Sequence, residues 1–121
     1  MATKLTTVGV AALVDTMDGT GSTGGAQRWI GSGTGVTAAT SGDTVIETET
    51  SEARVVGVFS QPSANTNRLV GTITYGTSKA IANAGNLSSS SGGTLYVHGD
   101  FTAVSVLASD AIQFSVDLAL S

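Results

Sequence analysis

The sequence contains a single histidine, His98, and its surroundings are the first place to look for chemistry. A catalytic histidine needs an acid that orients its ring and a nucleophile that it can activate. Asp100 lies two residues further on and would share one strand face with His98, and Ser105 is a conceivable nucleophile. No nucleophile-elbow motif surrounds that serine. The pattern therefore favours a solvent-facing strand histidine over a catalytic one.

Two groups of acidic residues could bind a cation or act on sugars. Asp15 and Asp18 precede Gly19 as in a calcium loop, but the usual ligand spacing and the closing glutamate are absent. Glycosidase chemistry would require Glu47 and Glu49 to face each other across a cleft. On one short segment the two share a face, which indicates solvation. We therefore expect neither a metal site nor a catalytic pair of carboxylates.

The glycine-rich stretch GSGTG, residues 31–35, resembles part of a dinucleotide-binding fingerprint. That motif needs a preceding buried strand, a following helix and an acidic residue about 20 positions further on. Here only Trp29 and Ile30 could supply the strand, and no suitable helix follows. We therefore expect a glycine-rich turn, no cofactor and no enzymatic activity.

Composition excludes several classes of protein. The formal charge is −4, and the five Lys and Arg residues are scattered, which argues against nucleic-acid binding. No apolar run approaches the roughly 20 residues of a membrane span. The chain has no cysteine, so it forms no disulfide or thiolate metal site. Residues 8–14, VGVAALV, lack the flanking residues that a signal peptide needs. A length of 121 residues fits one domain.

The elements that would position these residues are strands. In the final segment Ile112, Phe114, Val116, Leu118 and Leu120 alternate with more polar residues, as in a strand with one buried face. Further β-branched or alternating runs occupy residues 8–14, 53–60, 68–76, 93–101 and 102–109. Polar, glycine-rich connections separate them. The spacing predicts a mostly antiparallel, all-β single domain over residues 1–121, a β-sandwich or jelly roll, with residues 1–5 as an extended arm.

Residues 81–97 should form a hairpin-like pair. Ile81 to Leu87 lead into the loop SSSSGG (88–93), and Leu95 to Val97 return. The serines can satisfy backbone groups locally and keep the loop in water. The period of two in the first strand places Ile81 and Asn83 on the same face.

Several segments, in order, resemble a family of small virion proteins of tailed bacteriophages. They are WIGSGTGVTAATSGDTVIETET, ARVVGVFS, RLVGTITYG, KAIANAGNLSSSSGGTLYVHGDF and DAIQFSVDLALS, and they cover about residues 29–121. The chain departs from the family at Ile81–Ala82–Asn83, where an acidic residue is usual, and at Asn86–Leu87, where an apolar pair is common.

The resemblance implies a non-enzymatic structural component of the virion. We expect a capsid decoration (cement) protein that binds the major capsid protein on the exterior of the capsid and stabilises the shell. A tail or tail-fibre subunit is the alternative, and a carbohydrate-binding β-sandwich is a more distant one. A decoration protein binds symmetrically arranged neighbours, so we expect a homo-oligomer, either a dimer or a trimer.

The expected interface residues follow from residue type and position. Ala2, Thr3 and Lys4 belong to a terminal segment that a neighbouring chain could order at small cost. Arg28 and Trp29 are of the types that most often anchor interfaces.

Overall fold

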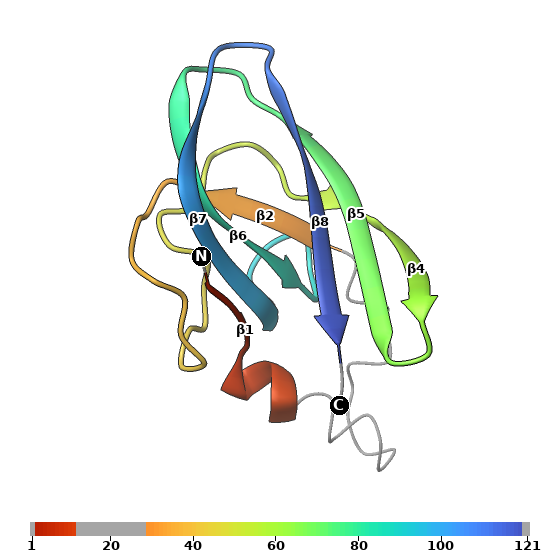
Figure 1. The fold of residues 1–121 in the computed structure, drawn as a ribbon. Helices are drawn as coiled ribbons and strands as arrows, with labels where there is room; N and C mark the ends of the chain where they lie inside the picture. The colour runs from red at the N-terminus through yellow and green to blue at the C-terminus, as the bar shows by residue number, and fades with distance from the viewer. Residues whose placement is uncertain (1, 12–28, 120–121) are drawn as a thin grey trace.

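The computed structural model describes residues 2–11 and 29–119, and these residues form an all-β domain (Figure 1). A short helix over residues 7–11 accompanies the strands. The strands are β1 (Ala2–Leu5), β2 (Trp29–Gly33), β3 (Val55–Val56), β4 (Val58–Ser63), β5 (Thr66–Thr74), β6 (Lys79–Leu87), β7 (Leu95–Val106) and β8 (Ala111–Ala119). The predicted all-β fold class is confirmed.

The strands form two sheets, which lie one in front of the other in Figure 1. The larger sheet has the order β1-β7-β6-β2-β3, and the smaller one has the order β4-β5-β8. All pairings are antiparallel. The body is therefore sandwich-like, as predicted. The finer assignment as a jelly roll stays a prediction.

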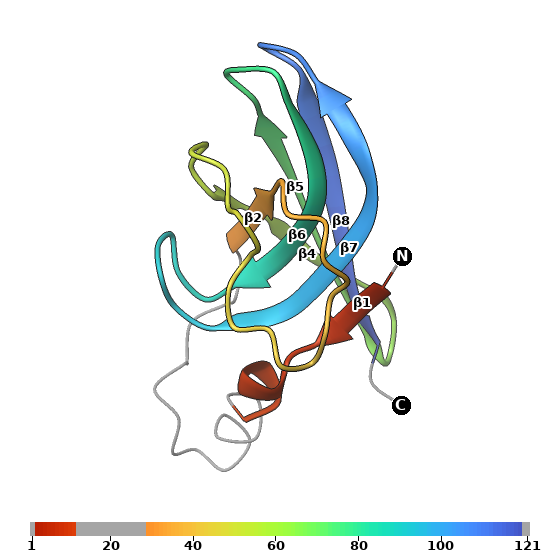
Figure 2. The same ribbon diagram turned by 90° about the vertical axis from the view of Figure 1, so that its left-hand side faces the viewer.

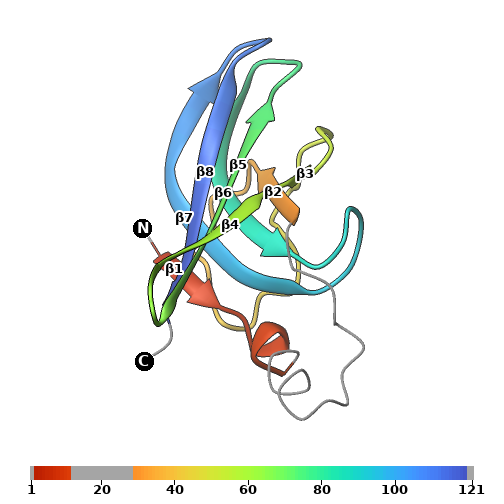
Figure 3. The same ribbon diagram turned by 90° about the vertical axis from the view of Figure 1, so that its right-hand side faces the viewer.

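The chain crosses between the sheets at Gly57, inside the run predicted as one strand over residues 53–60. β3 ends at Val56 in the larger sheet, and β4 begins at Val58 in the smaller one. A Cβ atom on Gly57 would lie 2.6 Å from Leu69 Cδ1, too close for any real side chain. Glycine therefore allows the backbone to pass directly over Leu69, and it closes one side of the sandwich (Figure 3).

The last two strands of the chain differ in how closely they follow the sequence pattern. The alternation predicted for the final segment is confirmed, because β8 exposes Gln113, Ser115 and Asp117 and buries Phe114 between them. The runs 93–101 and 102–109, predicted as separate strands, belong to one continuous strand, β7.

The N-terminal segment differs from its prediction. Residues 7–11 are helical and not part of a strand; Ala12 and Val14 lie outside the described residues. The buried Thr6 explains the change, because its Oγ1 accepts a hydrogen bond from Gly9 N (3.0 Å) and so caps the helix. Residues 2–5, predicted as an arm, pair with β7 of the same chain as strand β1.

A hydrophobic core fills the space between the sheets. Its buried residues come from β2, β5, β6, β7 and β8 and from Tyr75, and they are Ile30, Leu69, Ile73, Tyr75, Ile81, Ala84, Val106 and Phe114. The Tyr75 hydroxyl lies 2.7 Å from Ser32 Oγ, so the polar atom of this fully buried ring is satisfied. Burial raises the pKa of Tyr75.

Residues 34–54, here called the covering segment, lie across the outer side of the larger sheet (Figure 2). Ile46 in this segment packs with Leu87 and Leu95 as a second buried cluster. Residues 81–87 of β6 are consequently buried throughout, on both faces of the strand. The register shift between Ile81 and Asn83 places Ile81 in the core, whereas Asn83 bonds to the covering segment, so the prediction of one shared face is wrong.

Candidate functional site

His98 lies beneath the covering segment and is only 2% exposed, so the prediction of a solvent-facing histidine is wrong. Its Nδ1 lies 2.6 Å from Asp43 Oδ2, and its Nε2 lies 2.9 Å from Asn83 Oδ1. Asp43 belongs to the covering segment and Asn83 to β6. The histidine therefore joins three parts of the fold.

The hydrogen-bond pattern around Asn83 defines which atom of its side-chain amide faces His98. Asn83 Nδ2 donates to the carbonyl oxygens of Gly35 and Glu47, each at 3.0 Å, so Oδ1 is the atom that accepts from His98 Nε2. Hydrogen bonds from the Thr40 backbone and from His98 lower the pKa of Asp43, which keeps this carboxylate ionised. Both ring nitrogens of His98 therefore have a hydrogen-bond partner, Asp43 on one side and Asn83 on the other.

The other members of the hypothetical catalytic group serve different roles. Asp100 Oδ1 accepts a hydrogen bond from Ala39 N (2.9 Å), which is a further tie to the covering segment. Ser105 is exposed and pairs with Ala80, whereas His98 pairs with Gly85, so the two lie far apart along β7. This geometry gives His98 a structural role, because it ties the covering segment to β6 and β7.

The glutamates of residues 47–52 also hold structure together instead of only solvating a surface. Glu47 accepts from Thr37 N (2.9 Å) and Thr37 Oγ1 (2.7 Å). Glu49 accepts two hydrogen bonds from Arg54 (2.7 and 2.9 Å). Glu52 accepts from Lys79 Nζ (2.8 Å) and Gly76 N (3.0 Å), and these bonds lower its pKa to about 2.

The serine-rich loop lies at the surface between β6 and β7, as predicted, but hydrogen bonds hold it to the rest of the domain. Arg54 Nη1 donates to the carbonyl oxygens of Ser89 (2.8 Å) and Gly92 (2.9 Å). Ser88 Oγ accepts from Thr94 N (2.8 Å) where the loop closes. Gly92 and Gly93 have positive φ angles, which serine would adopt only with strain.

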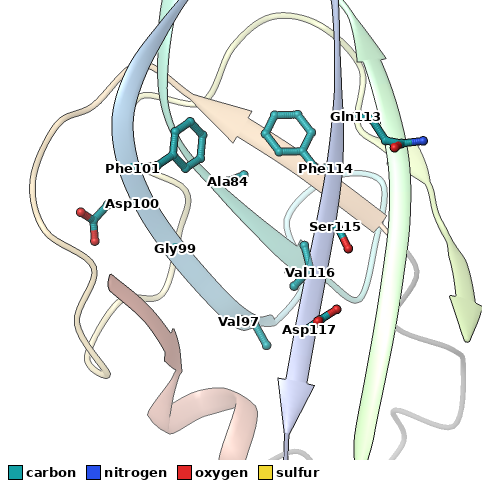
Figure 4. A pocket seen from close by; sticks show the side chains of 10 residues that line it. All are labelled: Ala84, Val97, Gly99, Asp100, Phe101, Gln113, Phe114, Ser115, Val116 and Asp117. Carbon is teal, nitrogen blue, oxygen red and sulfur yellow. The ribbon is translucent and has the colours of Figure 1, made fainter. Parts of the chain in front are cut away.

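The main surface feature is an open cleft between β7 and β8 (Figure 4). It has a volume of about 380 Å³. Its lining is apolar on the floor and polar at the rim, and comprises Ala84, Val97, Gly99, Asp100, Phe101, Gln113, Phe114, Ser115, Val116 and Asp117. Phe101 and Phe114 are in ring contact, with centroids 6.3 Å apart.

The loops at one end of the sandwich explain why this side stays open. Tyr75 N donates to Asp110 O, and Ser109 N donates to Tyr75 O, each at 2.8 Å. These bonds hold the β7–β8 connection against the end of β5, so β7 continues into one sheet and β8 into the other (Figure 1). No ladder joins β7 to β8 within residues 29–119. Sequence reasoning missed the cleft, because both strands show ordinary alternation.

A smaller cavity of about 80 Å³ lies between the sheets near the other end of β8. Asn67, Asn86 and Tyr96 line it together with apolar side chains. Asn86 Oδ1 and the Tyr96 hydroxyl are buried and have no hydrogen-bond partner among the described side chains and backbone. Asn86-Leu87-Ser88 has the form of an N-glycosylation sequon, and its asparagine is only 9% exposed.

The predicted interface residues lie in separate places. Trp29, half-buried at the start of β2, packs on the cluster of Ile46, Leu87 and Leu95 and is the cross-strand partner of the exposed Val56. Ala2, Thr3 and Lys4 lie in the edge strand β1. Arg28 lies outside the described residues, as do Asp15 and Asp18.

Neither a metal-binding cluster nor a membrane-spanning helix is found in the described part of the chain. Residues 2–11 and 29–119 contain no group of three or more His, Asp and Glu side chains placed to hold a metal ion. In the same residues no helix has the length and apolar character needed to cross a membrane.

Comparisons with known proteins give no match. No protein-family model fits the sequence, and no curated protein or solved structure is significantly similar to it.

Proposed function

We propose that this protein is a structural component of a tailed-bacteriophage particle and that it decorates the exterior of the capsid. The ordered series of segments over residues 29–121, which resembles small virion proteins, is the observation that carries the proposal. The two-sheet body with its clamped loops agrees with a role in binding rather than in a reaction. Its net charge of −4 suits the outer side of a shell that encloses DNA.

The partly exposed Trp29 and its neighbour Val56 are the best candidates for contact with the major capsid protein. Val56 is 52% exposed, so two adjacent apolar side chains present themselves at the surface. Aromatic anchors of this kind often contribute most of the energy of an interface. Repetition over many equivalent sites of a shell would add avidity to a modest contact.

Cosedimentation with capsid shells tests the proposal. Shells assembled from the major capsid protein of the same genome are mixed with the purified chain and separated on a gradient. We expect the chain to travel with the shells and to saturate at a fixed ratio. A chain that stays at the top of the gradient at every concentration would contradict capsid decoration.

Two variants test the contact surface. Val56→Lys changes an exposed side chain and should weaken shell binding by at least about tenfold while the fold is kept. Trp29→Ala should weaken it as well, with circular dichroism as the check on folding. A folded Trp29→Ala variant that binds as well as the wild type would show that Trp29 is no anchor.

The tail or tail-fibre alternative predicts binding to tails and not to shells. The carbohydrate-binding alternative needs an exposed aromatic platform. Of the six aromatic residues, Tyr75, Tyr96 and Phe114 are buried and Trp29 and Phe101 are partly buried; only Phe59, at 39%, is classed as exposed. The surface therefore favours a protein partner over a sugar.

A further inference from the structure

The four sheet edges of the domain differ in their protection against pairing with another chain. β1 is four residues long and carries the exposed Lys4, and β3 has only two residues. β4 contains Pro62 and a register shift between Ser60 and Ser63. Short length, lysine, proline and bulges are the devices by which proteins block their edges.

Strand β8 has none of these devices. Its nine residues, AIQFSVDLA, include no Lys or Pro, and it pairs with β5 without any register shift. Its other edge borders the open cleft, where Phe101 and Val116 line an apolar floor (Figure 4). A long, regular and nearly uncharged edge beside an apolar cleft is a surface suited to receive a strand.

We infer that this edge binds the β8 edge of a second copy of the chain, so that two three-stranded sheets join as one antiparallel six-stranded sheet across a twofold axis. A twofold axis pairs the same surface on both copies and makes a closed dimer. Each β8 would lie beside the other's cleft, so both apolar floors would be covered at once.

Charge and side-chain size favour a register centred on Ser115. Asp117, the only charged residue of β8, then lies opposite Gln113 of the other copy, from which it can accept a hydrogen bond. Phe114 lies opposite Val116, an aromatic and β-branched pair of the kind that stabilises sheets. A register centred on Asp117 would instead place two carboxylates face to face.

This dimer goes beyond the proposed function, because it would form in solution without any particle. The two can therefore fail separately: a monomer could still bind shells, and a dimer could ignore them. A decoration protein with this surface would be delivered to the shell as pairs.

A single introduced cysteine tests both the dimer and its register, because the chain has no cysteine of its own. Ser115→Cys should form a disulfide-linked dimer under mild oxidation. Thr72→Cys is the matched control: Thr72 is exposed and pairs with Gln113, but it lies on the central strand β5 and should not cross-link. Equal cross-linking of the two variants, or none at Ser115, would overturn the inference.

Analytical ultracentrifugation supplies a second readout. The wild type should sediment as a dimer, and Ser115→Lys, which places two lysines face to face, should raise the dissociation constant at least about tenfold. Thr72→Lys should stay dimeric. A monomeric wild type, or a Ser115→Lys variant that dimerises as well as Thr72→Lys, would contradict pairing through β8.

Discussion

At the scale of single residues, polar side chains that the sequence pattern predicts at the surface instead join separate segments of the chain. His98 was expected to face solvent, yet it links segments that are distant in sequence, and Glu52 does the same. Their partners explain why the buried His98 and the partly buried Glu52 can leave water, because a polar group does so only where other groups satisfy it.

Glu52 should make folding stability depend on pH. Its pKa is lowered from 4.5 to about 2, because Lys79 and Gly76 N donate to the carboxylate. A group with a lower pKa in the folded state stabilises above its unfolded value and loses that contribution as the pH falls. Glu52→Gln should therefore cost about 1–3 kcal/mol at neutral pH, and the difference from wild type should shrink between pH 4.5 and about 2.

Chemical denaturation at a series of pH values checks this expectation. Asp117→Asn is the control, because its bond to Arg68 is also charged but both side chains are more than 40% exposed. It should change the stability much less. A Glu52→Gln penalty that is constant across the acid range would contradict the linkage.

His98 should be essential for holding the covering segment. His98→Leu removes both ring contacts and leaves Asn83 Oδ1 and Asp43 without this partner, so it should cost about 2–4 kcal/mol. Ser105→Ala, on the exposed part of the same strand, should change stability by less than about 0.5 kcal/mol.

Amide hydrogen exchange tests whether His98 holds the covering segment against the larger sheet. Relative to the wild type, His98→Leu should accelerate amide hydrogen exchange in the covering segment more than in the core. Unchanged exchange at Gly35 and Thr37 in the variant would speak against this role of His98.

At the scale of elements, alternation of apolar residues predicted the strands but not what covers them. The final strand could be recognised because period two survives in it, and the hairpin around residues 81–97 because two short apolar runs flank a serine- and glycine-rich loop. The covering segment could not, because its buried apolar residues are only Ala39 and Ile46, which form no periodic pattern. The register shift after Ile81 reverses the strand faces without any sequence signal that distinguishes it.

Arg54 should determine the order of the serine-rich loop. Its guanidinium joins Glu49 to two carbonyl oxygens of residues 88–93, and its side chain is only 9% exposed. Arg54→Lys keeps the charge but loses the fork geometry, so it should cost about 1–2 kcal/mol. Amide exchange in the loop should accelerate, with Arg68→Lys as a control that leaves the loop unchanged. Equal exchange rates in the two variants would contradict this role.

At the scale of the whole molecule, the two-sheet body has one closed side and one open side. The crossing at Gly57 closes the first, and the divergence of β7 and β8 opens the second. The sequence indicated the class of fold and, through the resemblance, the class of function that we propose. The open side depends on contacts between loops that are far apart along the chain, so local patterns carry no trace of it.

The central claim is that this domain acts by attachment to the outside of a phage capsid. Electron cryo-microscopy of purified virions, with and without the gene for this chain, tests it most directly. The account predicts density the size of this domain at symmetry-related sites on the exterior of the head, which disappears when the gene is deleted. Heads that look the same in both preparations, or density confined to the tail, would contradict it.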